Sequence, residues 1–144
     1  MSYWKLYYHI AWATYDRLPL IDAGSEGVIA RTLHSKAKEL GCYIHTLGMV
    51  EEHLHVAATI PPTLALAKVV GEMKGCSSHA VNHVRPPTQR VFKWQDGYGV
   101  VSFGERSLPA ITVYVRNQKR HHAGGTTNPL FERIDAGLQR RSPR

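Results

Sequence analysis

Hydrophobic and polar positions alternate from residue 53 to residue 60, which predicts a β-strand. Side chains two apart on a strand share one face, so His53 and His55 point the same way. The intervening hydrophobic residues face a core on the other side: Leu54, Val56, Ala58 and Ile60. Two imidazoles on a firmly held strand suit a metal-binding pair. Two hydrogen-bonded surface histidines are the alternative.

The same kind of pattern predicts the remaining elements. In chain order they are a strand at 6–14, a helix from after Ser25 to Leu40, strands at 43–50 and 53–59, a helix over 64–83, and a strand at 99–103. The second and third strands form a hairpin at Glu51 and Glu52. This βαββαβ order is typical of a split βαβ sheet with both helices on one face. We therefore predict an α+β fold of the ferredoxin-like or RRM-like type, with an antiparallel sheet whose histidine face is open.

A further helix is expected near the C-terminal end. Ser107 can cap it, Pro109 falls in its first turn, and Gly124 with Gly125 ends it. Tyr114 and Gln118 are four residues apart and are thus neighbours on one helix face. The alternative is a half-buried aromatic residue beside a solvated polar one.

Length and charge narrow the class of protein. A chain of 144 residues is the length of one domain, so we expect a single domain over 1–144 with a flexible basic tail at 135–144. The net charge of +7 favours a polyanionic partner, most commonly nucleic acid. Candidate phosphate contacts, which a solvated basic face would mimic, are Arg17, Lys68, Lys74, Arg116, Lys119 and Arg120.

Other compositional features exclude some classes. The two cysteines, Cys42 and Cys76, are too few for a disulfide framework and lack the close spacing of a thiolate zinc site. No apolar stretch is long enough to cross a bilayer, and the first residues lack the layout of a secretory signal. A cytoplasmic location is therefore expected.

Four sequence features now occur in one order: the opening strand from Tyr8 to Thr14, the His-hydrophobic-His strand, the segment Trp94–Gly99, and the Tyr-x-x-x-Gln helix continuing to His122. Together they resemble the IS200/IS605-like single-tyrosine transposases (the HUH, Y1 family), including the repeat-associated tyrosine transposases. The resemblance extends from about residue 4 to residue 131. One departure is Asp16, where family members often have a basic residue.

The resemblance implies a function and a site. Tyr114 would attack single-stranded DNA, become linked to a 5′ phosphate and leave a free 3′ hydroxyl, which makes the protein a metal-dependent DNA transposase. His53, His55 and Gln118 would bind the divalent cation; the alternative for Gln118 is a hydrogen bond to the DNA or to bound water. Two nitrogens and one amide oxygen tolerate Mg²⁺ or Mn²⁺, and a three-ligand catalytic zinc site is the alternative.

The resemblance also implies partners. Family members recognise hairpins near element ends and act as homodimers, in some of which the tyrosine helix meets the histidines of the other subunit. The short connection at 104–106 could serve as the hinge for such a composite active site. Trp94 and Tyr98 could stack on unpaired bases, or could instead pack the loop beneath the site.

Two functions from other classes stay open. An open four-stranded sheet also suits a non-catalytic nucleic-acid-binding module, although such sheets usually present aromatic side chains rather than histidines. A metal-dependent nuclease that activates water would use the histidine pair and leave Tyr114 without a chemical role.

Overall fold

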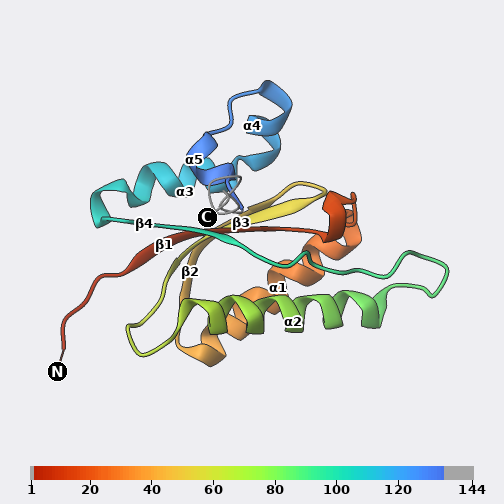
Figure 1. Cartoon of the computed structure of the whole chain (residues 1–144), viewed down its shortest axis with the longest axis horizontal. Coiled ribbons are helices and arrows are strands. Elements are labelled where there is room, and N and C mark those ends of the chain that lie inside the picture. Colours follow the sequence, from red (N-terminus) through yellow and green to blue (C-terminus); the bar gives the residue numbers. More distant parts are fainter. Residues whose placement is uncertain (1, 135–144) are drawn as a thin grey trace, which may run out of the picture.

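A four-stranded antiparallel sheet with helices on both faces forms the molecule (Figure 1). The computed structural model describes residues 2–134. The strands are β1 (Tyr7–Ala13), β2 (Tyr43–Met49), β3 (His53–Thr59) and β4 (Gly99–Phe103), in the spatial order β2-β3-β1-β4. The helices are α1 (Ala23–Leu40), α2 (Leu66–Val84), α3 (Leu108–Arg116), α4 (Gln118–Gly124) and α5 (Pro129–Glu132), with short 3₁₀ turns at Tyr15–Arg17 and Glu105–Ser107. The predicted βαββαβ order and α+β class are confirmed.

The main core lies between the sheet and the two long helices. Leu54 and Val56 of β3 are fully buried there, with Ile29 and Leu33 of α1 and Val70 of α2 among their neighbours. The alternation of β3 therefore has the predicted sense, with hydrophobic side chains toward α1 and α2. Register fixes this sense, since a slip of one residue would send the histidines into the core.

The aromatic loop before β4 belongs to the same core. The ring of Trp94 packs edge-on against Trp12, and its indole N–H donates to Ser77 Oγ at 2.9 Å. Tyr98 is partly buried against the same cluster. Of the two predicted roles for these aromatics, the structure shows packing.

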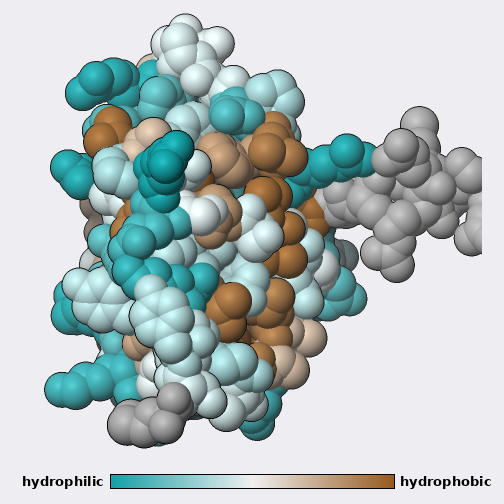
Figure 2. All heavy atoms as spheres, turned by 90° about the vertical axis from the view of Figure 1, so that its left-hand side faces the viewer, coloured by the Kyte–Doolittle hydropathy of each residue, from teal (hydrophilic) through white to brown (hydrophobic). Residues whose placement is uncertain are grey.

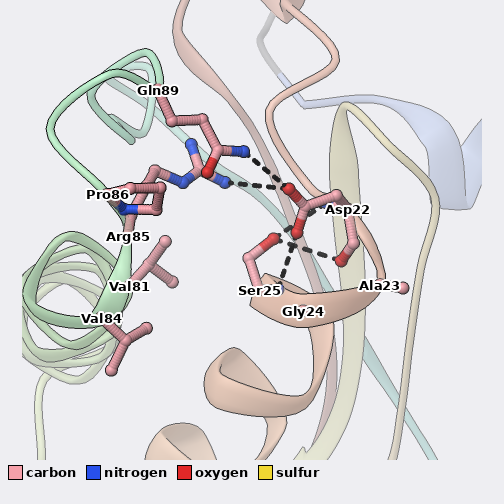
Figure 3. A pocket seen from close by; sticks show the side chains of 9 residues that line it. All are labelled: Asp22, Ala23, Gly24, Ser25, Val81, Val84, Arg85, Pro86 and Gln89. Atoms are coloured by element: carbon pink, nitrogen blue, oxygen red, sulfur yellow. Dashed lines mark hydrogen bonds and ion pairs between the residues drawn. The ribbon is translucent and has the colours of Figure 1, made fainter.

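The start of α1 differs from the prediction. The helix begins at Ala23 rather than after Ser25, because Asp22 is its N-cap: Asp22 Oδ1 accepts from the Ser25 amide, and Ser25 Oγ accepts from the Asp22 amide, both at 2.8 Å. Beside this cap lies a pocket of about 440 Å³ (the Asp22 pocket), where Gln89 donates to Asp22 and Arg85 lies 3.7 Å from the same carboxylate (Figure 3).

The second face of the sheet is not open, which corrects the sequence prediction. The three short helices α3, α4 and α5 cover it (Figure 1), so that His53 and His55 are only 1% and 0% exposed. Gly48 of β2 permits the close approach of α3, because a Cβ there would lie 1.9 Å from the carbonyl oxygen of Val115. Periodicity identified the face but not the helices that cover it.

The single helix predicted after Ser107 is two helices. The chain leaves helical geometry at Asn117 (φ −99°, ψ 30°), where α3 ends and α4 begins, and the Ser107 side chain makes no capping hydrogen bond. The predicted end is right, since Gly125 adopts the left-handed conformation at φ 68°. The bend lets α4 and the segment after it turn back over the histidines.

The end of the molecule where β4 turns toward α3 carries a band of hydrophobic side chains bordered by hydrophilic ones (Figure 2). Val100 of β4 and Val113 of α3 are among the exposed hydrophobic residues. No helix within residues 2–134 is long and apolar enough to cross a membrane. The predicted basic tail, 135–144, lies outside the described residues.

Candidate functional site

Two histidines of β3 form the base of the candidate site, and each is oriented by a neighbour. The Nδ1 atom of His53 lies 2.8 Å from Glu52 Oε1, and the Nδ1 atom of His55 lies 2.8 Å from His9 Nε2. The register of β1 and β3 places His9 near His55. With each Nδ1 occupied, each Nε2 atom points away from the strand, which is how outer partners orient metal-binding histidines.

Burial keeps the inner imidazoles uncharged. Desolvation, followed by the nearby His55, lowers the pKa of His9 to about 3, and desolvation also lowers the pKa of His55. A neutral His55 that donates from Nδ1 to His9 has a lone pair on Nε2. That nitrogen is available to a cation.

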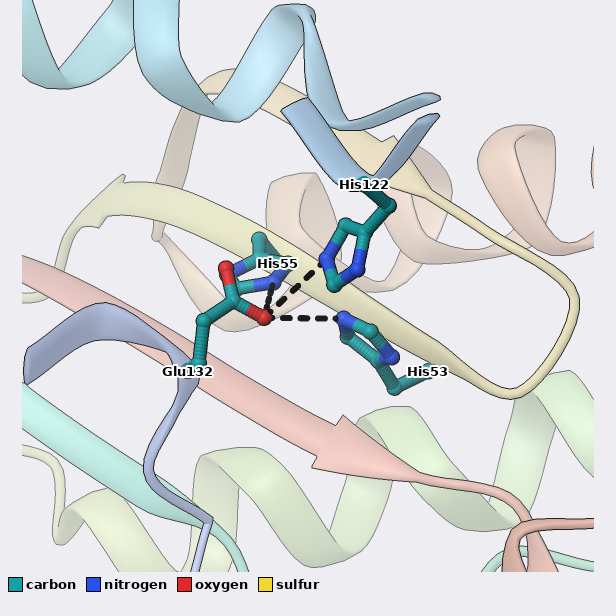
Figure 4. A group of neighbouring side chains, drawn as sticks. All are labelled: His53, His55, His122 and Glu132. Atoms are coloured by element: carbon teal, nitrogen blue, oxygen red, sulfur yellow. Dashed lines mark ion pairs between the residues drawn. The ribbon is translucent and has the colours of Figure 1, made fainter. Parts of the chain in front are cut away.

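Two further residues complete the cluster, and sequence reasoning did not assign either to the site. His122 of α4 and Glu132 of α5 lie over the β3 histidines (Figure 4). Glu132 Oε1 is 3.2 Å from His53 Nε2, 3.3 Å from His55 Nε2 and 3.1 Å from His122 Nε2. We call these four residues the histidine cluster.

The charge of Glu132 is well defined. Burial disfavours its ionised form, but the nearby imidazoles of His53 and His55 outweigh burial and hold the pKa of this carboxyl far below its ordinary range. A carboxylate therefore faces three imidazoles.

Tyr114 contacts the same carboxylate. Its hydroxyl donates to Glu132 Oε2 and accepts the Asn128 amide at 2.8 Å. The phenol ring stacks on His121 and stands edge-on to His55, with centroids 4.6 Å and 6.1 Å away. Burial, with Glu132 adding to it, raises the pKa of Tyr114 to about 12, so the phenol is protonated at neutral pH. The predicted meeting of tyrosine and histidine pair occurs here within one chain.

Gln118 lies between the tyrosine and the cluster. It is buried, its Nε2 donates to the Tyr114 carbonyl oxygen at 3.0 Å, and its Oε1 lies 3.2 Å from His122 Nε2. The predicted adjacency of Tyr114 and Gln118 thus survives the break at Asn117. Metal ligation by Gln118 stays a prediction.

The spacing of four from Tyr114 to Gln118 continues to His122, and this pattern could have identified His122 as a residue of the site. Glu132 left a weaker trace: it is the only acidic residue between Glu105 and Asp135. Neither observation predicts that Glu132 lies over the sheet.

Three of the predicted phosphate contacts have partners within the chain. Arg17, which follows Asp16 in a left-handed turn, pairs with Glu52 at 2.9 Å, and Lys74 donates to the carbonyl oxygens of Gln95 and Gly97. Since Glu52 also contacts His53, Arg17 is connected to the site through one carboxylate. Lys119 pairs with Glu26.

The other three basic candidates, Lys68, Arg116 and Arg120, are exposed. Arg116 and Arg120 line a hollow of about 280 Å³ together with Lys119 and the buried Gln118. The basic residues of α3 and α4 therefore lie next to the tyrosine and the cluster, whereas Lys68 lies on α2.

The residues of the cluster fit a divalent cation. Within residues 2–134, His53 Nε2 and His55 Nε2 are buried and have no partner with hydrogen-bond geometry. Buried polar nitrogens are costly to leave unpaired. Imidazole nitrogens and a carboxylate oxygen are the donors that divalent transition metals accept.

The family model described as "Transposase IS200 like" matches residues 2–118, and the chain belongs to this family. No curated protein matches the chain.

Two solved structures are similar. A Deinococcus radiodurans R1 protein assigned as a transposase shares 25% identity, with a TM-score of 0.61, over 81% of this chain and 93% of that one. A REP-associated tyrosine transposase, solved bound to a REP hairpin, shares 13% identity with a TM-score of 0.62, over 88% of this chain and 73% of that one. At 13% identity, the similarity to the second structure shows a common fold alone.

Proposed function

We propose that this chain cleaves and rejoins single-stranded DNA through a covalent link between Tyr114 and a 5′ phosphate. One observation carries the proposal: the Tyr114 hydroxyl and three imidazoles meet the same Glu132 carboxylate within one chain. A nucleophile beside a candidate cation site has the arrangement needed for phosphoryl transfer.

The reaction is an exchange of esters. The Tyr114 oxygen forms a bond to the scissile phosphorus, the bond from phosphorus to the 3′ oxygen breaks, and the departing oxygen takes a proton. A 3′ hydroxyl from another strand then attacks the phosphotyrosine and restores the phenol. Because each step replaces one phosphate ester by another, no nucleotide cofactor is consumed.

His53, His55 and Gln118 are the proposed protein ligands of the divalent cation, Mg²⁺ or Mn²⁺. When bound, this cation supplies Lewis-acid polarisation of a phosphate oxygen. Glu52 and His9 hold the two imidazoles so that Nε2 faces the site. Holding these groups in the geometry of the reaction lowers its activation barrier.

Tyr114 is protonated in the observed arrangement, and the adjacent Glu132 carboxylate disfavours a phenolate. Its proton must therefore leave as the bond to phosphorus forms. Glu132 Oε2 accepts the hydroxyl hydrogen and so orients the phenol oxygen. Because its pKa is strongly lowered, this carboxylate is too weak a base to keep the proton, which passes to solvent. DNA entry must also shift α5, which covers the phenol.

The substrate we propose is single-stranded DNA with hairpins. The hairpin-bound transposase of the same fold supports this substrate class. The hollow formed by Arg116, Lys119 and Arg120 beside Gln118 provides positive charge for the phosphate backbone.

A homodimer is a further part of the proposal. The outer edge of β4 pairs with no strand among residues 2–134, and exposed Val100 lies on it. The cis contact of Tyr114 with Glu132 favours sites that are complete within each chain. If sites were instead composite, mixing Tyr114→Phe with a His53→Ala/His55→Ala variant would restore activity in the heterodimers.

The test is a denaturing gel of the full chain incubated with single-stranded hairpin DNA and Mn²⁺ or Mg²⁺. We expect DNA that stays attached to the protein, and no attachment with Tyr114→Phe or with a chelator. Cleavage that survives Tyr114→Phe would favour the water-using nuclease, and reversible binding without cleavage would favour the binding module. The covered sheet face already disfavours an RRM-like binding mode.

A further inference from the structure

The three Nε2 atoms of the histidine cluster surround a single oxygen. Glu132 Oε1 lies 3.1 to 3.3 Å from all three, and one donor atom from each of the four residues lies within 4.8 Å of the others. Ligands held about 2.0–2.1 Å from a tetrahedral metal are about 3.3 Å apart. The three distances from Glu132 Oε1 to the imidazole nitrogens are therefore those of atoms that share one cation.

The elements that carry these donors are built to converge. His53 and His55 come from β3, His122 from α4, and Glu132 from α5 (Figure 4). Gly99 of β4 allows the segment after Glu132 to come close, since a Cβ there would lie 1.9 Å from the Arg133 carbonyl oxygen. Ile134 is then buried beside Ala11 and Ala13 of β1. Residues 133 and 134 thus pack against the sheet.

The contacts of the cluster call for a positive centre. His53 Nε2 and His55 Nε2 make no hydrogen bond with good geometry among the described residues, although Glu132 Oε1 is close to both. Lone pairs on two nitrogens and one oxygen that face one another repel unless a cation lies between them. Glu132 forms ion pairs with His53, His55 and His122.

We propose that His122 and Glu132 are metal ligands, so that the site holds its cation with three imidazole nitrogens and one carboxylate oxygen. This inference rests on the proposed function, in which His53 and His55 bind the cation. In this ligand set His122 and Glu132, both from the C-terminal segment, replace Gln118, which is instead the hydrogen-bond partner of His122. Glu132 thereby contacts the cation through Oε1 and the Tyr114 hydroxyl through Oε2.

The donor set has a consequence for the metal. Three nitrogen ligands favour transition-series ions over Mg²⁺, which prefers oxygen ligands and retains several waters. We therefore expect Mn²⁺ to bind more tightly than Mg²⁺, and Co²⁺ more tightly than Mn²⁺. A site made only of His53, His55 and Gln118 has one nitrogen fewer and no protein charge.

The test is calorimetric titration of the full chain with Mn²⁺, in the absence of DNA. Glu132→Gln and His122→Gln should each raise Kd at least about tenfold, the smaller loss expected even for an outer partner of a ligand. The matched controls Glu39→Gln and His34→Gln, on exposed positions of α1, should leave Kd unchanged. Circular dichroism verifies that each variant is folded.

A second measurement needs no variant. The electron paramagnetic resonance spectrum of the Cu²⁺-loaded wild-type chain counts the coordinated nitrogens, and we expect three. Two nitrogens, with Mn²⁺ affinity unchanged in both Glu132→Gln and His122→Gln, would overturn the inference but leave the proposed function standing. Failure of the wild-type chain to bind any of these ions would reject both.

Discussion

The Asp22 pocket and the histidine cluster each join segments far apart in the sequence, but their polar groups are satisfied differently. In the pocket, the Asp22 carboxylate accepts hydrogen bonds from Ser25 and Gln89, and Arg85 donates to the Leu20 carbonyl oxygen at 2.8 Å. In the cluster, the Nε2 atoms of two buried histidines lack such partners. A satisfied polar group stabilises the fold, whereas buried imidazole nitrogens without a partner, gathered beside a carboxylate, suit a cation.

The size of a pocket does not indicate whether its polar groups are free to bind a ligand. The Asp22 pocket is a hollow of about 440 Å³, yet its polar groups are occupied by one another. The cluster is covered by α4 and α5, and its buried Nε2 atoms lack hydrogen-bond partners. We therefore expect changes in the pocket to affect folding, and changes in the cluster to affect metal binding and DNA cleavage.

The largest effect should come from His55→Gln. This change removes a buried nitrogen that faces the cluster and also the partner of His9. We expect the rate of covalent attachment to DNA to fall at least about 100-fold, the upper range for disturbing even an outer partner of a metal ligand. His79→Gln, on the exposed side of α2, is the control. A normal rate in His55→Gln would refute the assigned site.

The next largest effect should come from Gly48→Ala. The added methyl group collides with the Val115 carbonyl oxygen and approaches Gln118, so α3 must move away from β2. We expect a loss of about 1–3 kcal/mol in the free energy of unfolding, as for other overpacked sites, together with slower attachment. Chemical denaturation measures the first quantity.

Gly71→Ala in α2 is the matched control for Gly48→Ala. A Cβ at Gly71 meets nothing within 4 Å, so the substitution should stabilise the helix by up to about 1 kcal/mol. Equal effects of the two substitutions would show that α3 does not depend on the close approach at Gly48.

A smaller effect, confined to stability, is expected in the Asp22 pocket. Asp22→Ala removes the N-cap of α1 and should cost about 0.5–2 kcal/mol of unfolding free energy. DNA attachment at a temperature where the variant stays folded should be unchanged. If the folded variant lost DNA attachment, the Asp22 pocket would affect the reaction as well as stability, and the proposed difference between the two regions would be wrong.

The contribution of the Asp22 carboxylate to stability depends on pH with a definite sign. The Ser25 amide, more than any other group, lowers the pKa of Asp22 below the ordinary value for aspartate, 3.8. The ionised side chain therefore contributes stability above about pH 4, and this contribution is lost as pH falls through the folded-state pKa. Asp22→Asn should flatten this part of the stability profile, measured by thermal unfolding at several pH values.

The smallest effect is expected at the basic hollow beside the cluster. Arg120→Ala should reduce the slope of log affinity against log salt by about 0.7, the value for one phosphate contact on a single strand. Lys38→Ala, exposed in the last turn of α1, should leave the slope unchanged. Fluorescence anisotropy with a labelled hairpin, titrated at several salt concentrations, measures both.

Local patterns predicted what depends on local geometry. The period of two in β3 placed His53 and His55 on one face, and the spacing of four kept Tyr114 beside Gln118. The order of the elements predicted the split βαβ sheet. Each of these follows from backbone geometry over a few residues.

Other features depend on how the chain returns in space. The bend at Asn117 and the turn after Gly125 bring α5 back over β3, and no periodicity encodes that return. Glu132 consequently escaped prediction, and the sheet face was expected to be open. The partners of Lys74 and Arg17 within the fold are likewise far away in sequence, so no local pattern predicts them.

The central claim is that Tyr114 is the residue that becomes linked to DNA. Mass spectrometry of the proteolysed, DNA-linked wild-type protein tests this most directly. We predict that the nucleotide is attached to the peptide containing Tyr114, at the phenolic oxygen. Attachment to any other residue, or strand cleavage without an attached peptide, would contradict the account.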